Sequence, residues 1–260
     1  MKYYGGCDVG STYTKAVILD ENGKICADTT IRSKINSEVS AKLAMEEVLN
    51  KVGLKSSEEL GYLIGTGYGR NKVPFADENI SEISCHAMGV HVTNPEVRAI
   101  IDIGGQDVKG ISIDTDGTVK NFAMNDKCAA GTGRFYEAMA RSFEMTLPEF
   151  SNLSLTAKNV IPITAQCTVF AESEVISQLA NGVRRPDLVA GICRSVASRV
   201  AALARRAGVT EQVCLSGGVA RNDAVRQALS DELNVPVSVD PLAQYFGAIG
   251  AALWAYKQTT

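Results

Sequence analysis

The sequence lacks the features that would assign it to several broad classes. No apolar run among its 260 residues reaches the roughly 18 residues that a membrane-spanning helix needs. Basic and acidic residues nearly cancel, 26 against 29, so there is no basic footprint for nucleic acid and no polybasic membrane patch. The first residues reach glycine and aspartate at once, without the apolar stretch of a signal peptide. We therefore expect a cytoplasmic protein that is neither exported nor inserted in a membrane.

Signatures of disulfides and simple metal sites are scarce as well. The seven cysteines are odd in number, and no two of them form a C-x-x-C pair. Without an export signal a disulfide framework is not expected, which leaves free core thiols, metal ligation or catalysis. The two histidines, His86 and His91, do not make a metal site.

The most informative feature present is an internal repeat. Each copy reads as a strand, a glycine-containing turn, a second strand, a hairpin turn and a third strand. The copies predict two related domains, 1–94 and 95–260, with the boundary at the turn signal Asn94-Pro95. The repeated pairs, all offset by 94 residues, are Asp8 and Asp102, Gly10 and Gly104, Lys15 and Lys109, Asp20 and Asp114, and Gly23 and Gly117.

Strands and helices alternate through the rest of the chain, which favours two α/β domains. Whether the last helix packs back on the first domain is left open. Apolar residues at helical spacing predict helices over Ser40–Val52, Arg134–Phe143, Thr168–Leu179, Ile192–Ala207, Asp223–Leu233 and Ala251–Tyr256. Strands are expected over Tyr3–Cys7, Tyr62–Ile64, Ala99–Ile101, Val213–Leu215 and Val235–Val239.

Both copies of the repeat carry a turn that suits a phosphate group. In the segment 8–12, Gly10 lets backbone N–H groups approach an anion, the hydroxyls of Ser11 and Thr12 add donors, and Asp8 suits a hydrated Mg²⁺. One such turn alone is better explained as a plain hairpin, whereas two turns meeting over one phosphate chain would clamp ATP. The second turn, 102–107, comprises Asp102, Ile103, Gly104, Gly105, Gln106 and Asp107.

A third glycine turn follows the strand Val213–Leu215. Its Gly217 and Gly218 expose backbone against which adenosine could lie flat, although close packing of a strand–helix turn needs glycines too. Lys15 and Gln244 complete the candidates for nucleotide contact.

In this order, the motifs DVGST at 8–12, DIGGQD at 102–107, LSGGVARN at 215–222 and the small-residue segment 247–252 resemble the actin/sugar-kinase/Hsp70 ATPase superfamily. The resemblance covers essentially the whole chain. It implies two duplicated ribonuclease-H-like domains with ATP, or ADP after hydrolysis, and Mg²⁺ in the cleft between them.

Two cysteines stand apart from the other five. Cys128 and Cys167 each precede an amphipathic stretch, so we expect both at helix N-termini, where the helix dipole favours a thiolate. A [4Fe–4S] cluster usually needs four thiolates, and a symmetric dimer would supply four from two per chain. Of the others, Cys85 is left open, and Cys7, Cys26, Cys193 and Cys214 are expected to be buried and inert.

The segments DKCAAGTGRF at 126–135 and TAQCTVFAESEVISQLANG at 164–182 resemble the activators of 2-hydroxyacyl-CoA dehydratases, a family that includes the ATPase subunits of benzoyl-CoA reductase. The resemblance implies an enzyme that works under anaerobic conditions. It also implies a homodimer with one [4Fe–4S] cluster held by Cys128 and Cys167 of both copies. ATP hydrolysis would drive transfer of one low-potential electron to a separate dehydratase, with 2-hydroxyglutaryl-CoA as its expected substrate. An upstream reductant such as ferredoxin or flavodoxin is implied too.

Two residues are candidates for positioning the attacking water. Glu82 opens an E-x(6)-G stretch that resembles the one carrying the catalytic carboxylate of exopolyphosphatases, and Gln106 competes with it. A solvated Glu82 beside a packed His86 is equally consistent with the spacing. The alternative function is a small-molecule kinase of the same fold, with Asp107 beside a substrate hydroxyl; a filament or chaperone ATPase is disfavoured by the short chain.

Overall fold

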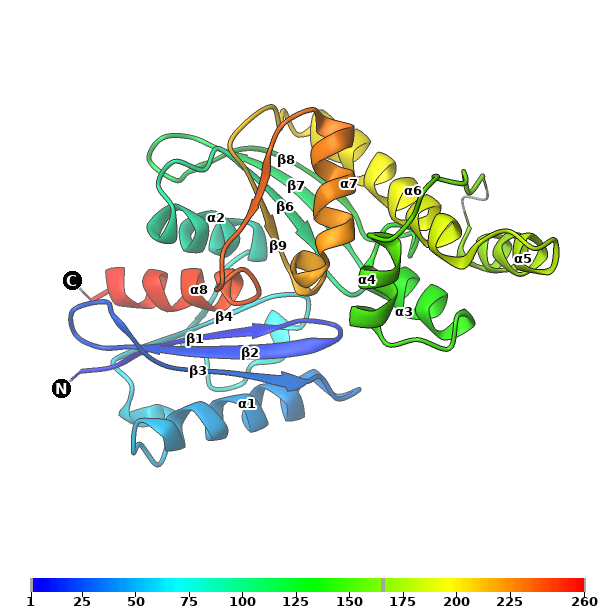
Figure 1. The fold of residues 1–260 in the computed structure, drawn as a ribbon. Helices are drawn as coiled ribbons and strands as arrows, with labels where there is room; N and C mark the ends of the chain where they lie inside the picture. Colours follow the sequence, from blue (N-terminus) through cyan, green and yellow to red (C-terminus); the bar gives the residue numbers. More distant parts are fainter. Residues whose placement is uncertain (1, 165–166, 260) are drawn as a thin grey trace. The chain divides into compact units, whose positions relative to one another are not determined.

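A computed structural model describes residues 2–164 and 167–259. The chain forms two compact units, each with its own five-stranded sheet (Figure 1). Unit 1 consists of the described parts of Met1–Val97, Ile113–Lys120 and Leu242–Thr260, and unit 2 of Arg98–Ser112 and Asn121–Pro241. No helix in the described part of the chain is both long and apolar enough to cross a membrane.

The two sheets have the same strand order, which confirms the duplication. The order is β3-β2-β1-β4-β5 in unit 1 and β8-β7-β6-β9-β10 in unit 2. In each, the first strand of the unit pairs antiparallel with the second and parallel with the fourth. The strands are β1 (Tyr4–Val9), β2 (Tyr13–Leu19), β3 (Ile25–Arg32), β4 (Tyr62–Thr66), β5 (Glu78–Asn79), β6 (Ala99–Ile103), β7 (Val108–Ile113), β8 (Val119–Asn125), β9 (Val213–Ser216) and β10 (Val237–Val239).

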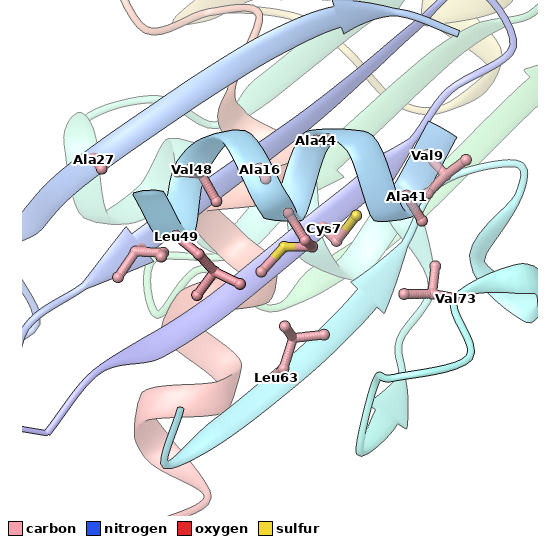
Figure 2. Packing of buried hydrophobic residues seen from close by; sticks show 12 residues of the cluster. Cys7, Val9, Ala16, Ala27, Ala41, Ala44, Val48, Leu49, Leu63 and Val73 are labelled. Atoms are coloured by element: carbon pink, nitrogen blue, oxygen red, sulfur yellow. The ribbon is translucent and has the colours of Figure 1, made fainter. Parts of the chain in front are cut away.

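Helices cover both faces of the unit 1 sheet. Side chains alternate along a strand, so Cys7 and Val9 of β1 face the apolar cluster under α1 (Ser37–Lys51) (Figure 2). Gly6 faces α8 (Phe246–Lys257), where a Cβ would lie 2.1 Å from the Ala248 carbonyl oxygen. This contact requires glycine and seats the start of α8 beside the end of β1.

Two glycines bring α8 against α2 (Glu82–Thr93) within unit 1. A Cβ on Gly89 would lie 2.2 Å from the Phe246 carbonyl oxygen, and one on Gly250 would lie 1.8 Å from that of Cys85. The small residues of the last helix therefore serve close packing between two helices.

Unit 2 carries a helical insertion between β8 and its longest helix. The insertion holds α3 (Gly133–Ser142), α4 (Leu147–Ser154) and α5 (Thr168–Ala180), and it is followed by α6 (Arg185–Arg206) and α7 (Asp223–Leu233). Helix α6 lies on the sheet at Gly110, where a Cβ would lie 2.8 Å from the Cα of Ala204. Short 3-10 turns occur at Ser57–Glu59, Arg70–Lys72 and Gly218–Arg221.

Two helices begin five or more residues before their predicted start, and one helix was not predicted. Helix α6 begins at Arg185, seven residues before the predicted start, because Pro186 suits the first turn of a helix. Helix α8 begins at Phe246, since its glycines pack rather than break the helix. Helix α4 was not expected, although Thr146 and Glu149 form a capping box at its start.

Candidate functional site

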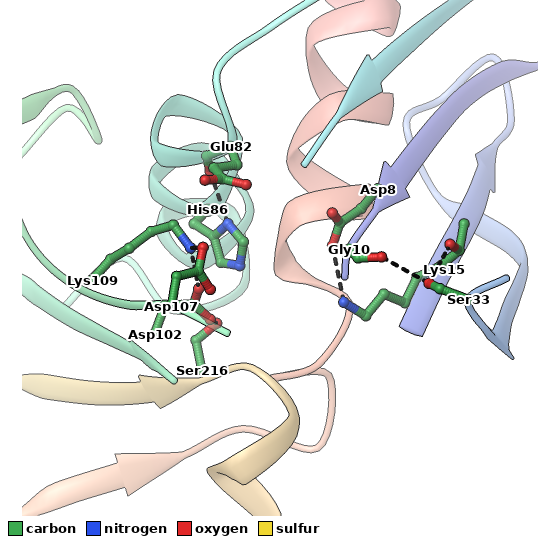
Figure 3. Close-up of polar contacts among 11 residues, drawn as sticks. Asp8, Gly10, Lys15, Ser33, Glu82, His86, Asp102, Asp107, Lys109 and Ser216 are labelled. Carbon is green, nitrogen blue, oxygen red and sulfur yellow. Dashed lines mark hydrogen bonds and ion pairs between the residues drawn. The ribbon is translucent and has the colours of Figure 1, made fainter. Parts of the chain in front are cut away.

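The first candidate phosphate loop begins where β1 ends (Figure 3). Asp8 is 4% exposed and lies directly across the antiparallel ladder from Lys15, with 3.1 Å between Lys15 Nζ and Asp8 Oδ2. Gly10 N donates to the Tyr13 carbonyl at 3.2 Å, and a Cβ on Gly10 would lie 2.6 Å from that oxygen. The turn is therefore restricted to glycine and holds an ion pair at its base.

The hydroxyls of Ser11 and Thr12 are the side-chain donors of this loop, and that of Thr12 is not used within the described part of the chain. Ser33 Oγ donates to the Gly10 carbonyl at 2.7 Å and fixes the loop from the end of β3 (Figure 3). Ser11 is half-buried beside it. Thr12 Oγ1 is buried and has no hydrogen-bond partner among the described residues. A buried hydroxyl without a partner is a candidate for contact with a bound anion or hydrated metal.

The second candidate loop repeats this arrangement in unit 2. Asp102 is 3% exposed and lies across the ladder from Lys109, with 3.2 Å between Lys109 Nζ and Asp102 Oδ2. Gly104 N donates to the Asp107 carbonyl at 2.9 Å, as Gly10 does to Tyr13 in the first loop. Asp107 adds a second carboxylate at 2.7 Å from Lys109 Nζ (Figure 3). Gly105 is half-buried and Gln106 exposed.

Each aspartate is also flanked by a glycine turn on the neighbouring parallel strand. Gly217 (φ +84°) follows β9, and a Cβ there would lie 2.7 Å from Asp102 Oδ1. Gly67 (φ +90°) follows β4, and a Cβ there would lie 2.4 Å from Asp8 Oδ1. Gly218 opens the 3-10 turn and has open space where a Cβ would stand.

The turn after β4 was not predicted from the sequence as part of the site. The ladder aligns Asp8 with Thr66 and Asp102 with Ser216, so Thr66-Gly67 is the counterpart of Ser216-Gly217. Ser216 Oγ donates to Asp102 Oδ1 at 3.1 Å. The signal was the Gly-Thr-Gly run at 65–67 after an apolar strand.

The second loop is tied directly to the start of α3. Gly133 N donates to the Gly104 carbonyl at 2.8 Å, and Arg134 N donates to the Gly105 carbonyl at 3.0 Å. With its amide oriented to suit the neighbours, the Gln106 carbonyl accepts from the Arg134 guanidinium at 3.2 Å. A displacement of the loop therefore reaches α3 through hydrogen bonds within unit 2.

Cys128 and Cys167 are both exposed free thiols of unit 2. Cys167 is the N-cap residue of α5, as expected, while Ala165 and Gln166 of its motif lie outside the described residues. The expectation for Cys128 was wrong. Helix α3 begins at Gly133 with Thr132 as its N-cap, because the Gly104 and Gly105 carbonyls engage its first N–H groups, so Cys128 lies in the preceding loop.

Burial separates the other cysteines into two groups. Four are buried, and burial raises the pKa of the Cys85 thiol to about 12 and those of Cys193 and Cys214 to about 11. The thiol pKa of Cys7 is raised further in the same direction. Cys26 is exposed, which corrects the expectation of a buried thiol. It lies on the edge strand β3 and alternates with Ala27, the side chain that joins the apolar cluster.

Glu82 is the first helical residue of α2, behind the N-cap Ser81. His86 Nδ1 lies 2.8 Å from the Glu82 carbonyl oxygen (Figure 3). A Cβ on Gly247 would lie 2.9 Å from Asp8 Oδ2 and 3.0 Å from His86 Cε1, so the two side chains flank the start of α8. Gln244 is half-buried in the turn before that helix. Among the described residues, no group of three or more His, Cys, Asp or Glu side chains is arranged to hold a metal ion.

Comparison with known proteins identifies the family. Residues 6–255 match the family described as BadF/BadG/BcrA/BcrD ATPase.

The chain belongs to the BadF/BadG/BcrA/BcrD ATPase family.

Three relatives match the chain over nearly its whole length. The (R)-2-hydroxyglutaryl-CoA dehydratase activating ATPase of Acidaminococcus fermentans is 48% identical over 98% of both chains. The activator of lactoyl-CoA dehydratase of Anaerotignum propionicum is 49% identical over 98% of both. The solved structure of the 2-hydroxyisocaproyl-CoA dehydratase activator from Clostridium difficile with bound ADPNP is 45% identical, covers 98% of this chain and 95% of its own, and has a TM-score of 0.92.

These matches and the sugar-kinase structure described next confirm the expected actin/sugar-kinase/Hsp70 type of ATPase fold, and the family is one of ATPases. A ROK family glucokinase from Streptomyces griseus, 14% identical with a TM-score of 0.58 over 98% of this chain and 99% of its own, shares the fold alone. The kinase alternative therefore has only distant support.

Proposed function

We propose that this chain is an ATP-hydrolysing activator that passes one low-potential electron to a 2-hydroxyacyl-CoA dehydratase. The observation that carries the proposal is the near-50% identity over 98% of the chain to two dehydratase activators. The relatives named above activate dehydratases of 2-hydroxyglutaryl-CoA, lactoyl-CoA and 2-hydroxyisocaproyl-CoA. All three have a similar sequence identity to this chain. Identity therefore supports the class of 2-hydroxyacyl-CoA without selecting the acyl group, and 2-hydroxyglutaryl-CoA stays one prediction among these.

The two loops are proposed to bind the phosphates of ATP. Their backbone turns, the partnerless Thr12 hydroxyl and the open backbone at Gly218 are the donor groups and the surface that such binding needs. Lys15 and Lys109 would add positive charge near the terminal phosphates.

Asp8 and Asp102 are proposed to hold Mg²⁺ through water. Each already has a lysine within 3.2 Å, so a direct bond to the metal would compete with an ion pair, whereas hydrogen bonds to metal-bound water would not. The carboxylate oxygens fit the preference of Mg²⁺ for oxygen ligands and retained water.

Cys128 and Cys167 of two copies are proposed to hold one [4Fe–4S] cluster. Both thiols are free and exposed, which fits ligation of a shared group at a dimer interface. A cluster bound there supplies a site that takes up and releases one electron. Two thiols per chain meet the usual requirement for four only in a symmetric dimer.

Nucleotide binding is proposed to reach both cysteines through α3. The helix starts on the Gly104 and Gly105 carbonyls, and near its end Ser142 Oγ donates to Glu172 of α5 at 2.7 Å. Helix α5 begins directly after Cys167, and the Cys128 loop leads into the start of α3. A shift of the second loop on loss of the γ-phosphate would therefore move both cysteine segments.

Glu82 and Gln106 remain the two proposed groups for orienting the attacking water. Gln106 lies on the second loop with its carbonyl held by Arg134, and Glu82 opens α2. Substituting each by its isostere, Glu82→Gln and Gln106→Glu, and comparing ATP turnover decides between them, because only the water-positioning residue should change turnover without changing nucleotide affinity.

The function is tested by anaerobic purification followed by iron, sulfide and mass analysis. The proposal predicts a brown protein with four iron and four sulfide per dimer, together with Mg²⁺-dependent ATP hydrolysis. A colourless protein that phosphorylates a small-molecule hydroxyl would replace this proposal with the kinase alternative. Full colour after days in air would contradict an exposed, interfacial cluster.

A further inference from the structure

A cavity of about 410 Å³ adjoins Cys128 in unit 2. One wall is a single face of α6, on which Arg199 and Arg206 stand two helical turns apart. The other lining residues come from the start of β7, the end of β8 and the Cys128 loop, and they comprise Val108, Asn125, Cys128 and Ala130. A proposed cluster ligand and two guanidinium groups thus line one space.

Asn125 holds the backbone of Cys128 in this wall. Its Nδ2 donates to the Cys128 carbonyl at 3.1 Å, while its Oδ1 accepts from Cys128 N at 3.3 Å and from Lys127 N at 3.4 Å. Because carbonyl and amide are both engaged, the loop presents the Cys128 side chain from a defined position.

Arg199 brings positive charge to that position. Its half-buried side chain stands among apolar lining residues, and this burial lowers the pKa of the Arg199 guanidinium, while the charge of Cys128 acts in the opposite direction. A partly desolvated cation is stabilised by an anion beside it, and an electrostatic interaction is stronger there than in water. Arg206 is exposed, so water screens its charge.

We propose that Arg199 is a positioning residue that holds a positive charge at Cys128 and thereby raises the reduction potential of the cluster. The inference rests on the proposed function. Uptake of an electron adds negative charge beside Cys128, and a nearby cation stabilises the reduced form more than the oxidised form. Charge and hydrogen bonding near the cluster sulfurs are among the quantities that set such potentials.

The first test uses protein without cluster. Cys128 is alkylated in parallel with iodoacetate, an anion, and with the neutral iodoacetamide, and the ratio of the two rates reports the local field, because the reactivity of the thiol itself cancels. Arg199→Gln should lower this ratio several-fold at Cys128 and leave it unchanged at Cys167. Arg199→Lys should restore most of it. An unchanged ratio at Cys128 overturns the proposal whether or not the protein binds a cluster.

The second test uses the cluster-loaded dimer. A redox titration followed by electron paramagnetic resonance should show Arg199→Gln with a reduction equilibrium about tenfold less favourable, which corresponds to about 59 mV for one electron. Arg194→Gln is the matched control, since Arg194 is exposed on the same helix and pairs with Glu232. A loaded Arg199→Gln dimer with the wild-type potential overturns the inference, whereas wild-type protein without any cluster overturns the proposed function instead.

Discussion

The two units share one sheet and one turn but differ in what surrounds the aspartate. In unit 1, Asp8 faces a single lysine, and the position that corresponds to Asp107 is Tyr13. In unit 2, Lys109 lies between Asp102 and Asp107, so that loop carries one more negative charge. Among the described residues, it is the unit 2 loop that is hydrogen-bonded to α3, the helix between the segments of the two exposed cysteines Cys128 and Cys167.

This difference indicates that the two copies of a duplicated fold can keep one shared function while one copy gains a second. Both copies keep the glycine turn and the buried ion pair, which suit phosphate binding. The insertion α3–α5 in unit 2 adds a route from the loop to Cys128 and Cys167. We therefore expect changes in the unit 1 loop to affect ATP chemistry, and changes in the unit 2 loop to affect both ATP chemistry and the response of the cluster to the nucleotide.

The largest expected effect is loss of the cluster. Cys128→Ser and Cys167→Ser should each remove nearly all bound iron, because an incomplete set of thiolates does not hold a [4Fe–4S] cluster. Nucleotide affinity should stay close to that of the wild type. Cys26→Ser in unit 1 is the control for an exposed thiol and Cys193→Ser the control for a buried one. Full iron content in either ligand variant would remove the assignment, as would loss of iron in the Cys26 control.

The next effect compares the two aspartates. Asp8→Asn should lower ATP turnover by about a hundredfold or more, since it removes charge where the phosphates and Mg²⁺ need compensation. Asp102→Asn should lower turnover less, because Asp107 remains 2.7 Å from Lys109. Steady-state hydrolysis with titrated Mg²⁺ measures both.

Asp20→Asn is the control for the aspartates, since Asp20 belongs to the same repeat but its carboxylate accepts from Asn22 N and Lys24 N of its own hairpin turn. A variant Asp8→Asn with nearly normal turnover would show that the metal is not held there. Equal losses in both loops would show that the extra carboxylate of unit 2 has no compensating effect.

A smaller effect concerns Gly67 and Gly217, the glycines of the turns that follow β4 and β9. Gly67→Ala and Gly217→Ala should each reduce the free energy of unfolding by about 2–5 kcal/mol, as left-handed strain and overpacking add. Gly53→Ala and Gly182→Ala also have positive φ but open space for a Cβ, so they should lose only about 1–2 kcal/mol. Urea unfolding measures all four. Similar losses in both pairs would mean that contact with Asp8 and Asp102 does not restrict these turns.

The smallest effect tests the link between α3 and α5. Ser142→Ala removes one hydrogen bond to Glu172 and should cost about 1 kcal/mol of stability. The diagnostic result is a smaller difference between the electron paramagnetic resonance signals of the cluster with ATP and with ADP, while the rate of ATP hydrolysis stays that of the wild type. Ser173→Ala on α5, whose hydroxyl donates to the Val169 carbonyl of its own helix, is the control. An unchanged nucleotide dependence in Ser142→Ala would exclude this link from the route.

The repeat in the sequence predicted the duplicated fold because its spacing is preserved where no insertion intervenes. Asp8 and Asp102 are offset by 94 residues, whereas the equivalent Thr66 and Ser216 are offset by 150. The offset grows because the inserted helices α3–α5 precede β9 in unit 2, and unit 1 has no counterpart of them before β4 in the described part of the chain. That insertion hid the turn at Gly67. Helix α4 is short, and its capping box was its only strong local signal.

Long-range contacts account for what local patterns missed at the site. Cys128 was expected at a helix start because it precedes the amphipathic stretch of α3, but that start is set by carbonyls of a loop 29 residues earlier in the chain. Cys26 was expected to be a buried thiol in the strand after a hairpin turn, but β3 is an edge strand, and it is Ala27 on its other face that joins the apolar cluster. Neither property is encoded by neighbouring residues.

Electron transfer from pre-reduced dimer to the dehydratase, measured in single turnover with ATP, ADP or a non-hydrolysable ATP analogue, tests the central claim most directly. If ATP binding at the two loops controls the cysteine segments, the single transfer occurs with ATP and with the analogue, and it is at least tenfold slower with ADP. Equal transfer in all three nucleotide states would contradict the account.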